Sequence, residues 1–141
     1  IYTLSLHDAL PISSWVGVET LRAEGEAKQI GQKFWDWGVP TAASIVYAQR
    51  AGHTVISTGG VRNGLDVARA IALGASVAGI ARPVLQALNA GGEAEAEAFL
   101  DRVERELQTV LLLTGSRTLA QLARAPRVLR GELRTWLDLQ A

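Results

Sequence analysis

A glycine pair followed by an arginine marks the place in this chain best suited to hold an anion. Residues Ser57–Asp66 read Ser-Thr-Gly-Gly-Val-Arg-Asn-Gly-Leu-Asp, and Ala81–Pro83 reads Ala-Arg-Pro. Glycine lets backbone N–H groups approach a phosphate closely, and helix starts direct further N–H groups toward it. Arginine adds a charge suited to bidentate phosphate contact. The pattern predicts a phosphate site formed by two neighbouring turns.

Two short apolar runs must position these turns. Thr54–Ser57 and Ser76–Ala81 are continuously apolar, as expected of parallel strands covered on both faces. Between them a helix ending at Gly74 is indicated by apolar residues at helical spacing: Leu65, Ala68, Ile71 and Ala72. Strand, helix and strand at this spacing form a βαβ unit. Two adjacent turns of this kind that hold a phosphate are typical of the last strands of a (β/α)8 barrel.

Helices are expected on both sides of this unit. Ser14–Glu19 leads into a helix, whereas the polar segment Glu24–Lys33 predicts a surface excursion. The remaining helices are expected over about Pro40–Arg50, Glu93–Leu113, Thr118–Arg124 and Glu132–Gln140. The inner face of the long one carries Leu100, Val103, Leu107, Val110 and Leu111. The fold class is therefore α/β: the C-terminal part of a (β/α)8 TIM barrel, with its last two to three βα units and C-terminal helices. The barrel is incomplete, because a whole one needs roughly 250 residues.

Composition narrows the functional class. The 141 residues carry 14 basic and 14 acidic side chains, so nothing points to nucleic acid or an anionic membrane. The absence of cysteine excludes disulfides, thiolate nucleophiles and thiolate metal sites from this segment. No apolar stretch approaches the roughly 18 residues of a membrane span, and no secretory signal is present. We expect a soluble, cytoplasmic protein.

Residues 1–12 do not continue this pattern. They read, residue for residue, as one reading frame of a common short-read sequencing adapter, so we interpret them as an artefact and exclude them from the fold. Residues 13–141 then form the genuine domain. The junction falls inside the codon of Ser13, whose natural identity is threonine if the native codon was ACN. His7 and Asp8 carry no functional weight on this interpretation.

Several segments in combination resemble the type 2 isopentenyl diphosphate isomerases. The resemblance runs from Ser13 or Ser14 to the last helix, and the combination is specific, whereas Gly-Gly-x-Arg alone occurs in many flavin barrels. The segments that carry it are Ser14–Glu19, Phe34–Ala42, Ser57–Ala75 and Leu112–Thr118.

The resemblance implies that the chain holds FMN. The turn at Gly59–Arg62 would bind the FMN phosphate through backbone amides, and the strand end at Ala81–Arg82 would form the adjoining wall. At Ser13 the family has a flavin-contacting threonine, and the departure coincides with the adapter junction. The implied cofactor-binding residues are Ser13, Gly59, Gly60, Val61, Arg62, Ala81 and Arg82.

The resemblance also implies an activity. Family members convert isopentenyl diphosphate to dimethylallyl diphosphate with FMN, Mg²⁺ and a reductant such as NADPH, and reduced flavin acts as the acid–base cofactor. The family's substrate contacts and its Mg²⁺ ligand lie in earlier strands, so no catalytic residue and no metal ligand is assigned to this chain. We expect a homo-oligomer for the full-length protein. His53, at the start of a strand, is interpreted as structural, and Trp15 as a packing residue.

Three alternatives stay open. The parent could be another FMN-dependent barrel such as an α-hydroxyacid oxidase, although those enzymes carry an Asn-His-Gly type motif where Ser14–Val16 stands here. It could be a flavin-free phosphosugar barrel with the same phosphate turns. The chain could also be a non-catalytic phosphate-binding fragment, because a half-barrel exposes sheet edges and apolar surface and tends to associate.

Overall fold

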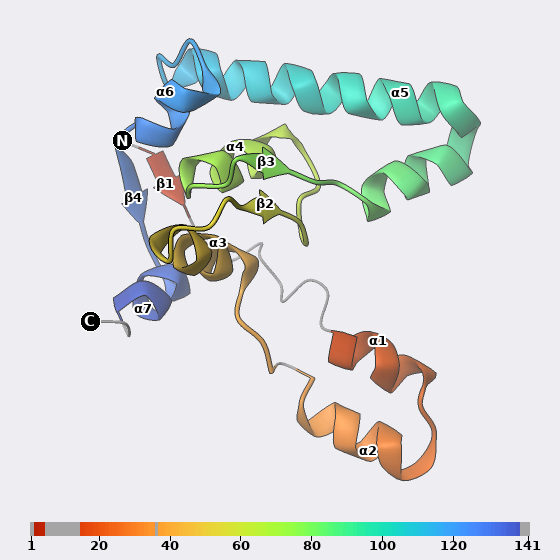
Figure 1. The fold of residues 1–141 in the computed structure, drawn as a ribbon. Coiled ribbons are helices and arrows are strands. Elements are labelled where there is room, and N and C mark those ends of the chain that lie inside the picture. Colours follow the sequence, from red (N-terminus) through yellow and green to blue (C-terminus); the bar gives the residue numbers. More distant parts are fainter. Residues whose placement is uncertain (1, 5–14, 36, 139–141) are drawn as a thin grey trace.

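A pair of short parallel strands joined through a helix forms the centre of the fold (Figure 1). The computed structural model describes residues 2–4, 15–35 and 37–138. Strand β2 (Ile56–Ser57) pairs with β3 (Val77–Ala78), with Ile56 opposite Val77 and Ser57 opposite Ala78. Helix α4 (Gly64–Ala72) connects them and packs against β3. The predicted βαβ unit is confirmed, with shorter strands than the apolar runs indicated.

The other described elements surround this unit. Before it come β1 (Tyr2–Leu4), α1 (Trp15–Arg22), α2 (Gly25–Lys33) and α3 (Thr41–Arg50). After it come α5 (Arg82–Leu113), α6 (Leu119–Arg124), β4 (Arg127–Leu129) and α7 (Glu132–Asp138). Helices α1 and α2 form a hairpin that stands away from the remaining elements in Figure 1.

Two apolar clusters hold the helices together. In the first, Leu133 of α7 is 1% exposed and lies among small and branched side chains of α3 and the end of α4. Its buried members are Ala43, Ile45, Ala70, Leu73, Ala75, Leu133 and Leu137. In the second, Ala68 and Ile71 of α4 pack with Leu122 of α6, and Leu107, Val110 and Leu111 of α5 lie against them. Helix α4 therefore contributes to both clusters, which agrees with its predicted amphipathic pattern.

Several predicted details are wrong. Leu65 and Leu100, assigned to inner helix faces, are 42% and 49% exposed because each lies near one end of the region where α4 and α5 pack. The polar segment predicted to lie at the surface is indeed exposed, and the structure adds that it is helical, as α2.

Two strands were not expected at all. Strand β4 is only three residues long, too short for a periodic signal, and it pairs in parallel with β1. β1 lies within the residues 1–12 interpreted as adapter-derived.

The expectation that the parallel strands are covered on both faces is also wrong for the described residues. Ser57 is 2% exposed, whereas its neighbour Ile56 is 67% exposed and Val77, opposite Ile56, is 53% exposed. Successive strand residues point to opposite faces, so one face of the pair is covered and the other is open.

No described helix is long and apolar enough to cross a membrane.

Candidate functional site

The carboxyl ends of β2 and β3 lie side by side, and each is followed by one of the turns singled out in the sequence. The parallel register and the bond from Gly79 N to Ser57 O (2.8 Å) fix the two strand ends at the same level. The chain then continues through Gly59–Arg62 on one side and Ile80–Arg82 on the other. The two sequence segments predicted to share a site therefore start from adjacent positions.

The glycine pair forms a turn that other residues would not readily adopt. Gly59 and Gly60 have φ angles of 91° and 81°, in the left-handed region that favours glycine. Among the described residues, no acceptor is bonded to the N–H groups of Gly59, Gly60 or Val61. The Val61 side chain is 6% exposed and anchors the turn, so only its amide can face a ligand. Successive N–H groups in such a turn suit an anion.

Asp66, in the first turn of α4, ties the end of the glycine turn to the helix. Its Oδ2 accepts from Arg62 N at 3.1 Å and from Arg62 Nε at 3.4 Å, and its Oδ1 accepts from Arg69 Nη1 at 3.1 Å. The Asp66 amide in turn donates to the Asn63 side chain at 2.8 Å, which caps the helix. The amide of Arg62 is therefore engaged within the chain, and a ligand would meet the residue through its guanidinium.

A carboxylate from a distant part of the chain also reaches this region. Glu106 of α5 accepts a hydrogen bond from Gly64 N at 2.7 Å, across 42 positions of sequence. The contact is close because α4 lies almost on the backbone of α5. A Cβ atom added to Gly64 would lie 2.2 Å from Val103 O. No local sequence signal pointed to Glu106, since its partner is fixed only by helix packing.

The second wall consists of the residues that start α5. Ala81 is the N-cap without a side-chain cap bond, and Arg82 and Pro83 begin the helix. Arg82 is exposed and forms no ion pair among the described residues. A proline at this position removes no helical bond, and the helix start contributes a favourable dipole for an anion.

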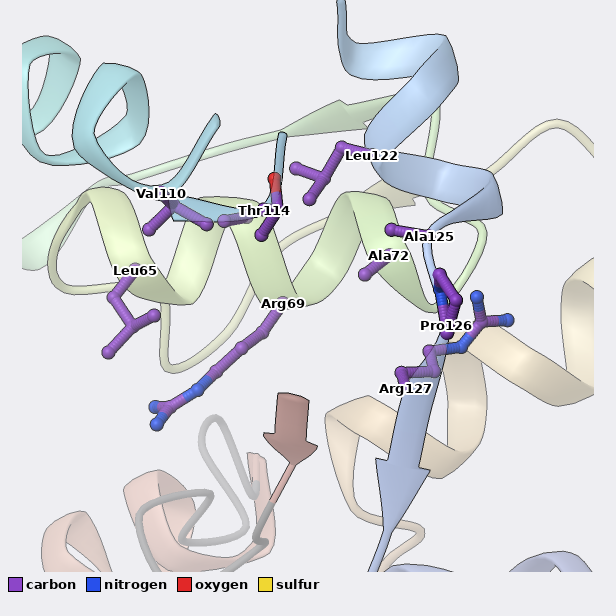
Figure 2. A pocket seen from close by; sticks show the side chains of 10 residues that line it. Leu65, Arg69, Ala72, Val110, Thr114, Leu122, Ala125, Pro126 and Arg127 are labelled. Atoms are coloured by element: carbon purple, nitrogen blue, oxygen red, sulfur yellow. The ribbon is translucent and has the colours of Figure 1, made fainter. Parts of the chain in front are cut away.

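A cavity of about 240 Å³ lies elsewhere, between α4, α5, α6 and the start of β4 (Figure 2). Two cations are among its lining residues, and both are bonded within the chain. Arg69 pairs with Asp66, and Arg127 Nη1 donates to Ala123 O at 3.1 Å. The other lining residues are Leu65, Ala68, Ala72, Val110, Thr114, Leu122, Ala125 and Pro126. This mainly apolar cavity is a weaker candidate for an anion than the glycine turn.

The family model for FMN-dependent dehydrogenases matches residues 39–129, which include both turns and every element from α3 to β4. The chain belongs to this family. Its glycine turn and the adjoining strand end accordingly lie within the part of the chain that the family model covers.

Curated relatives of the chain are isopentenyl-diphosphate delta-isomerases, which confirms the resemblance stated from the sequence. The protein of Methanothrix thermoacetophila is 48% identical over 130 residues, covering 89% of this chain and 36% of that protein. That of Sulfurisphaera tokodaii is 45% identical over 131 residues, covering 89% and 35%. The chain thus spans about a third of the length of these relatives.

Solved structures similar to the chain are oxidases. Mandelate oxidase with benzoyl-formic acid matches with a TM-score of 0.58 and 34% identity, over 64% of this chain and 28% of that one. A mandelate oxidase variant with a monooxide FMN adduct gives the same TM-score and identity, over 64% and 30%. A lactate oxidase of Pediococcus acidilactici gives 0.54 and 29%, over 60% and 24%.

Of the predicted cofactor-binding residues, the structure brings Gly59–Arg62 and Ala81–Arg82 to neighbouring strand ends. Ser13 lies outside the described residues, and so does the side chain of Trp15. His53 precedes β2 with its side chain exposed, while its amide donates to Ala48 O at 3.0 Å. Within the described part of the chain, no group of three or more His, Cys, Asp or Glu residues could hold a metal ion.

Proposed function

We propose that this chain is the C-terminal portion of a type 2 isopentenyl-diphosphate isomerase and supplies the wall that binds the FMN phosphate. The observation that carries the proposal is the 48% identity to such an isomerase over 89% of the chain. The identity to the oxidase structures is 29–35%, over 60–64% of the chain. Residues 1–12 would be adapter-encoded, and residues 13–141 would complete a TIM barrel whose earlier strands lie in the rest of the protein.

The residues of the two turns fit a phosphate. The N–H groups of Gly59 and Gly60 would donate to its oxygens, and Arg82 would approach from the start of α5 with a full positive charge. Arg62 would add its guanidinium at the rim, held there by Asp66. Bound FMN in its reduced form would supply acid–base chemistry at the alkene of isopentenyl diphosphate. This chain would orient the flavin by its phosphate end, and the diphosphate substrates would be bound by residues outside it.

The remaining partners also belong to the rest of the protein. We place the Mg²⁺ ligand, the NADPH-dependent reduction of the flavin and the contacts to both isoprenoid diphosphates in the preceding strands. We further propose a cytoplasmic homo-oligomer. The 141-residue chain alone should neither retain FMN nor isomerise substrate. Ile56 and Val77 are exposed on one face of the strand pair, so the residues that would complete the flavin site on that face belong to the rest of the protein.

The test uses a fusion protein, the completed enzyme, in which residues 14–141 follow the preceding part of the Methanothrix thermoacetophila isomerase. We expect it to bind FMN more tightly than riboflavin, which lacks the phosphate, and to convert isopentenyl diphosphate. A completed enzyme that binds FMN but does not convert isopentenyl diphosphate would count against an isomerase as the parent of this chain. Flavin binding with no preference for FMN would refute the phosphate site, and stoichiometric flavin in the purified 141-residue monomer would refute the fragment proposal.

A further inference from the structure

We propose that Glu106 is a positioning residue for the flavin phosphate: its carboxylate, on the far half of α5, fixes the start of α4 and thereby the amides of the glycine turn. This inference rests on the function proposed above. Glu106 would not touch the phosphate. It would act through Gly64, with which it forms a hydrogen bond of 2.7 Å.

The glycine turn is fixed at both of its ends. At the first, Ser57 is held in the β2–β3 pair. At the second, Asp66 and Asn63 supply acceptors, but both are local to α4 and would move with it. Glu106 supplies a further acceptor at this end, and it comes from another element. Its bond to Gly64 holds the start of α4, and with it this end of the turn, against α5.

The contact is built for close approach. Besides Val103 O, a Cβ on Gly64 would meet Leu107 N at 2.6 Å, so the first turn of α4 rests directly on the backbone of α5. Glu106 is half-buried there, and a hydrogen bond from an amide to a carboxylate is short and strong. The same bond engages the Gly64 amide, so a phosphate is left with the amides of Gly59–Val61.

Helix α5 serves both walls of the site. Gly91 (φ −148°, ψ 19°) and Gly92 (φ 71°, ψ −159°) break its helical path, and Figure 1 shows the chain turning there and running back along α4. The part before the break begins with Arg82 at the second wall, and the part after it carries Glu106 to the first. A change at Glu106 should therefore alter how the two walls face one another without altering the rest of the flavin pocket.

The test measures dissociation constants of the completed enzyme for FMN and for riboflavin by quenching of flavin fluorescence. Glu106→Ala should weaken FMN binding about tenfold, about 1.4 kcal/mol, and leave riboflavin binding unchanged. Glu106→Gln keeps a neutral acceptor and should weaken FMN binding about threefold. The matched control is Glu104→Ala, since Glu104 is exposed on the same helix and accepts only from Gln108 in the described structure. It should change neither constant.

Each outcome has a definite meaning. Equal loss of FMN and riboflavin affinity in E106A would show a merely structural role and overturn the inference, as would unchanged FMN binding. If E106A does not fold, unchanged FMN binding in E106Q overturns it. A parent enzyme without preference for FMN over riboflavin would instead overturn the proposed function.

Discussion

Replacing Gly64 by alanine sets two well-defined effects against each other. Helix propensity alone predicts a gain of up to about 1 kcal/mol, since alanine is the better helix former. The packing predicts a loss, because the new Cβ would lie 2.2 Å from Val103 O and 2.6 Å from Leu107 N. Both are backbone atoms of a helix, which cannot rotate out of the way as a side chain can.

The packing effect should prevail. Overpacking typically costs about 1–3 kcal/mol, and separating the helices also breaks the bond from Gly64 N to Glu106, a kind worth about 1.5–3 kcal/mol. We therefore expect Gly64→Ala to lower the free energy of unfolding of the completed enzyme by about 2–5 kcal/mol. In a protein of this size, that should lower Tm by several degrees.

The assay is thermal unfolding of the flavin-free completed enzyme, with Gly38→Ala as the control. Among the described residues, no atom lies within 4 Å of a Cβ at Gly38, so that variant should stay within about 0.5 kcal/mol of the parent. A Gly64→Ala protein with a Tm at or above that of the parent would refute the reasoning. It would mean that α4 and α5 separate at no cost.

Three further substitutions test other contacts in the completed enzyme. Asn63→Ala removes the cap that accepts from Asp66 N and should cost about 1 kcal/mol by urea unfolding, whereas Asn63→Asp should restore most of it. Leu133→Ala should cost about 2–5 kcal/mol in the same assay because the side chain is 1% exposed, and a loss below 1 kcal/mol would contradict its place in the core. Arg62→Gln should weaken FMN binding measurably, while the hydrogen bond from its backbone amide to Asp66 stays in place. Unchanged FMN affinity would remove the Arg62 guanidinium from the site.

The βαβ unit could be predicted because its signals are local. Apolar runs gave the strands, helical spacing gave α4, and Gly74 gave its end. The relation between the two turns followed as well, because adjacent parallel strands must end at the same edge. Here the structure confirmed that the two turns follow neighbouring strand ends.

Contacts between distant segments could not be predicted in this way. Glu106 reads as one of several acidic residues on a solvated helix, and nothing near it in sequence indicates that it meets Gly64. Leu65 has the right period for the inner face, yet it is 42% exposed because it lies near one end of the region where α4 and α5 pack. Strand β4 pairs through backbone bonds that residues of almost any type other than proline could form.

The exposed face of the β2–β3 pair, which carries Ile56 and Val77, has a consequence for how the proposed parent enzyme folds during its synthesis. Chains fold as they leave the ribosome, N-terminal parts first. A C-terminal portion emerges last, when the strands that would cover this face have already been synthesised. Its apolar surface would then seldom meet water in the cell, and closure of the sheet and formation of the two phosphate-binding turns would coincide. Capture of the cofactor would thus follow the synthesis of this part of the protein.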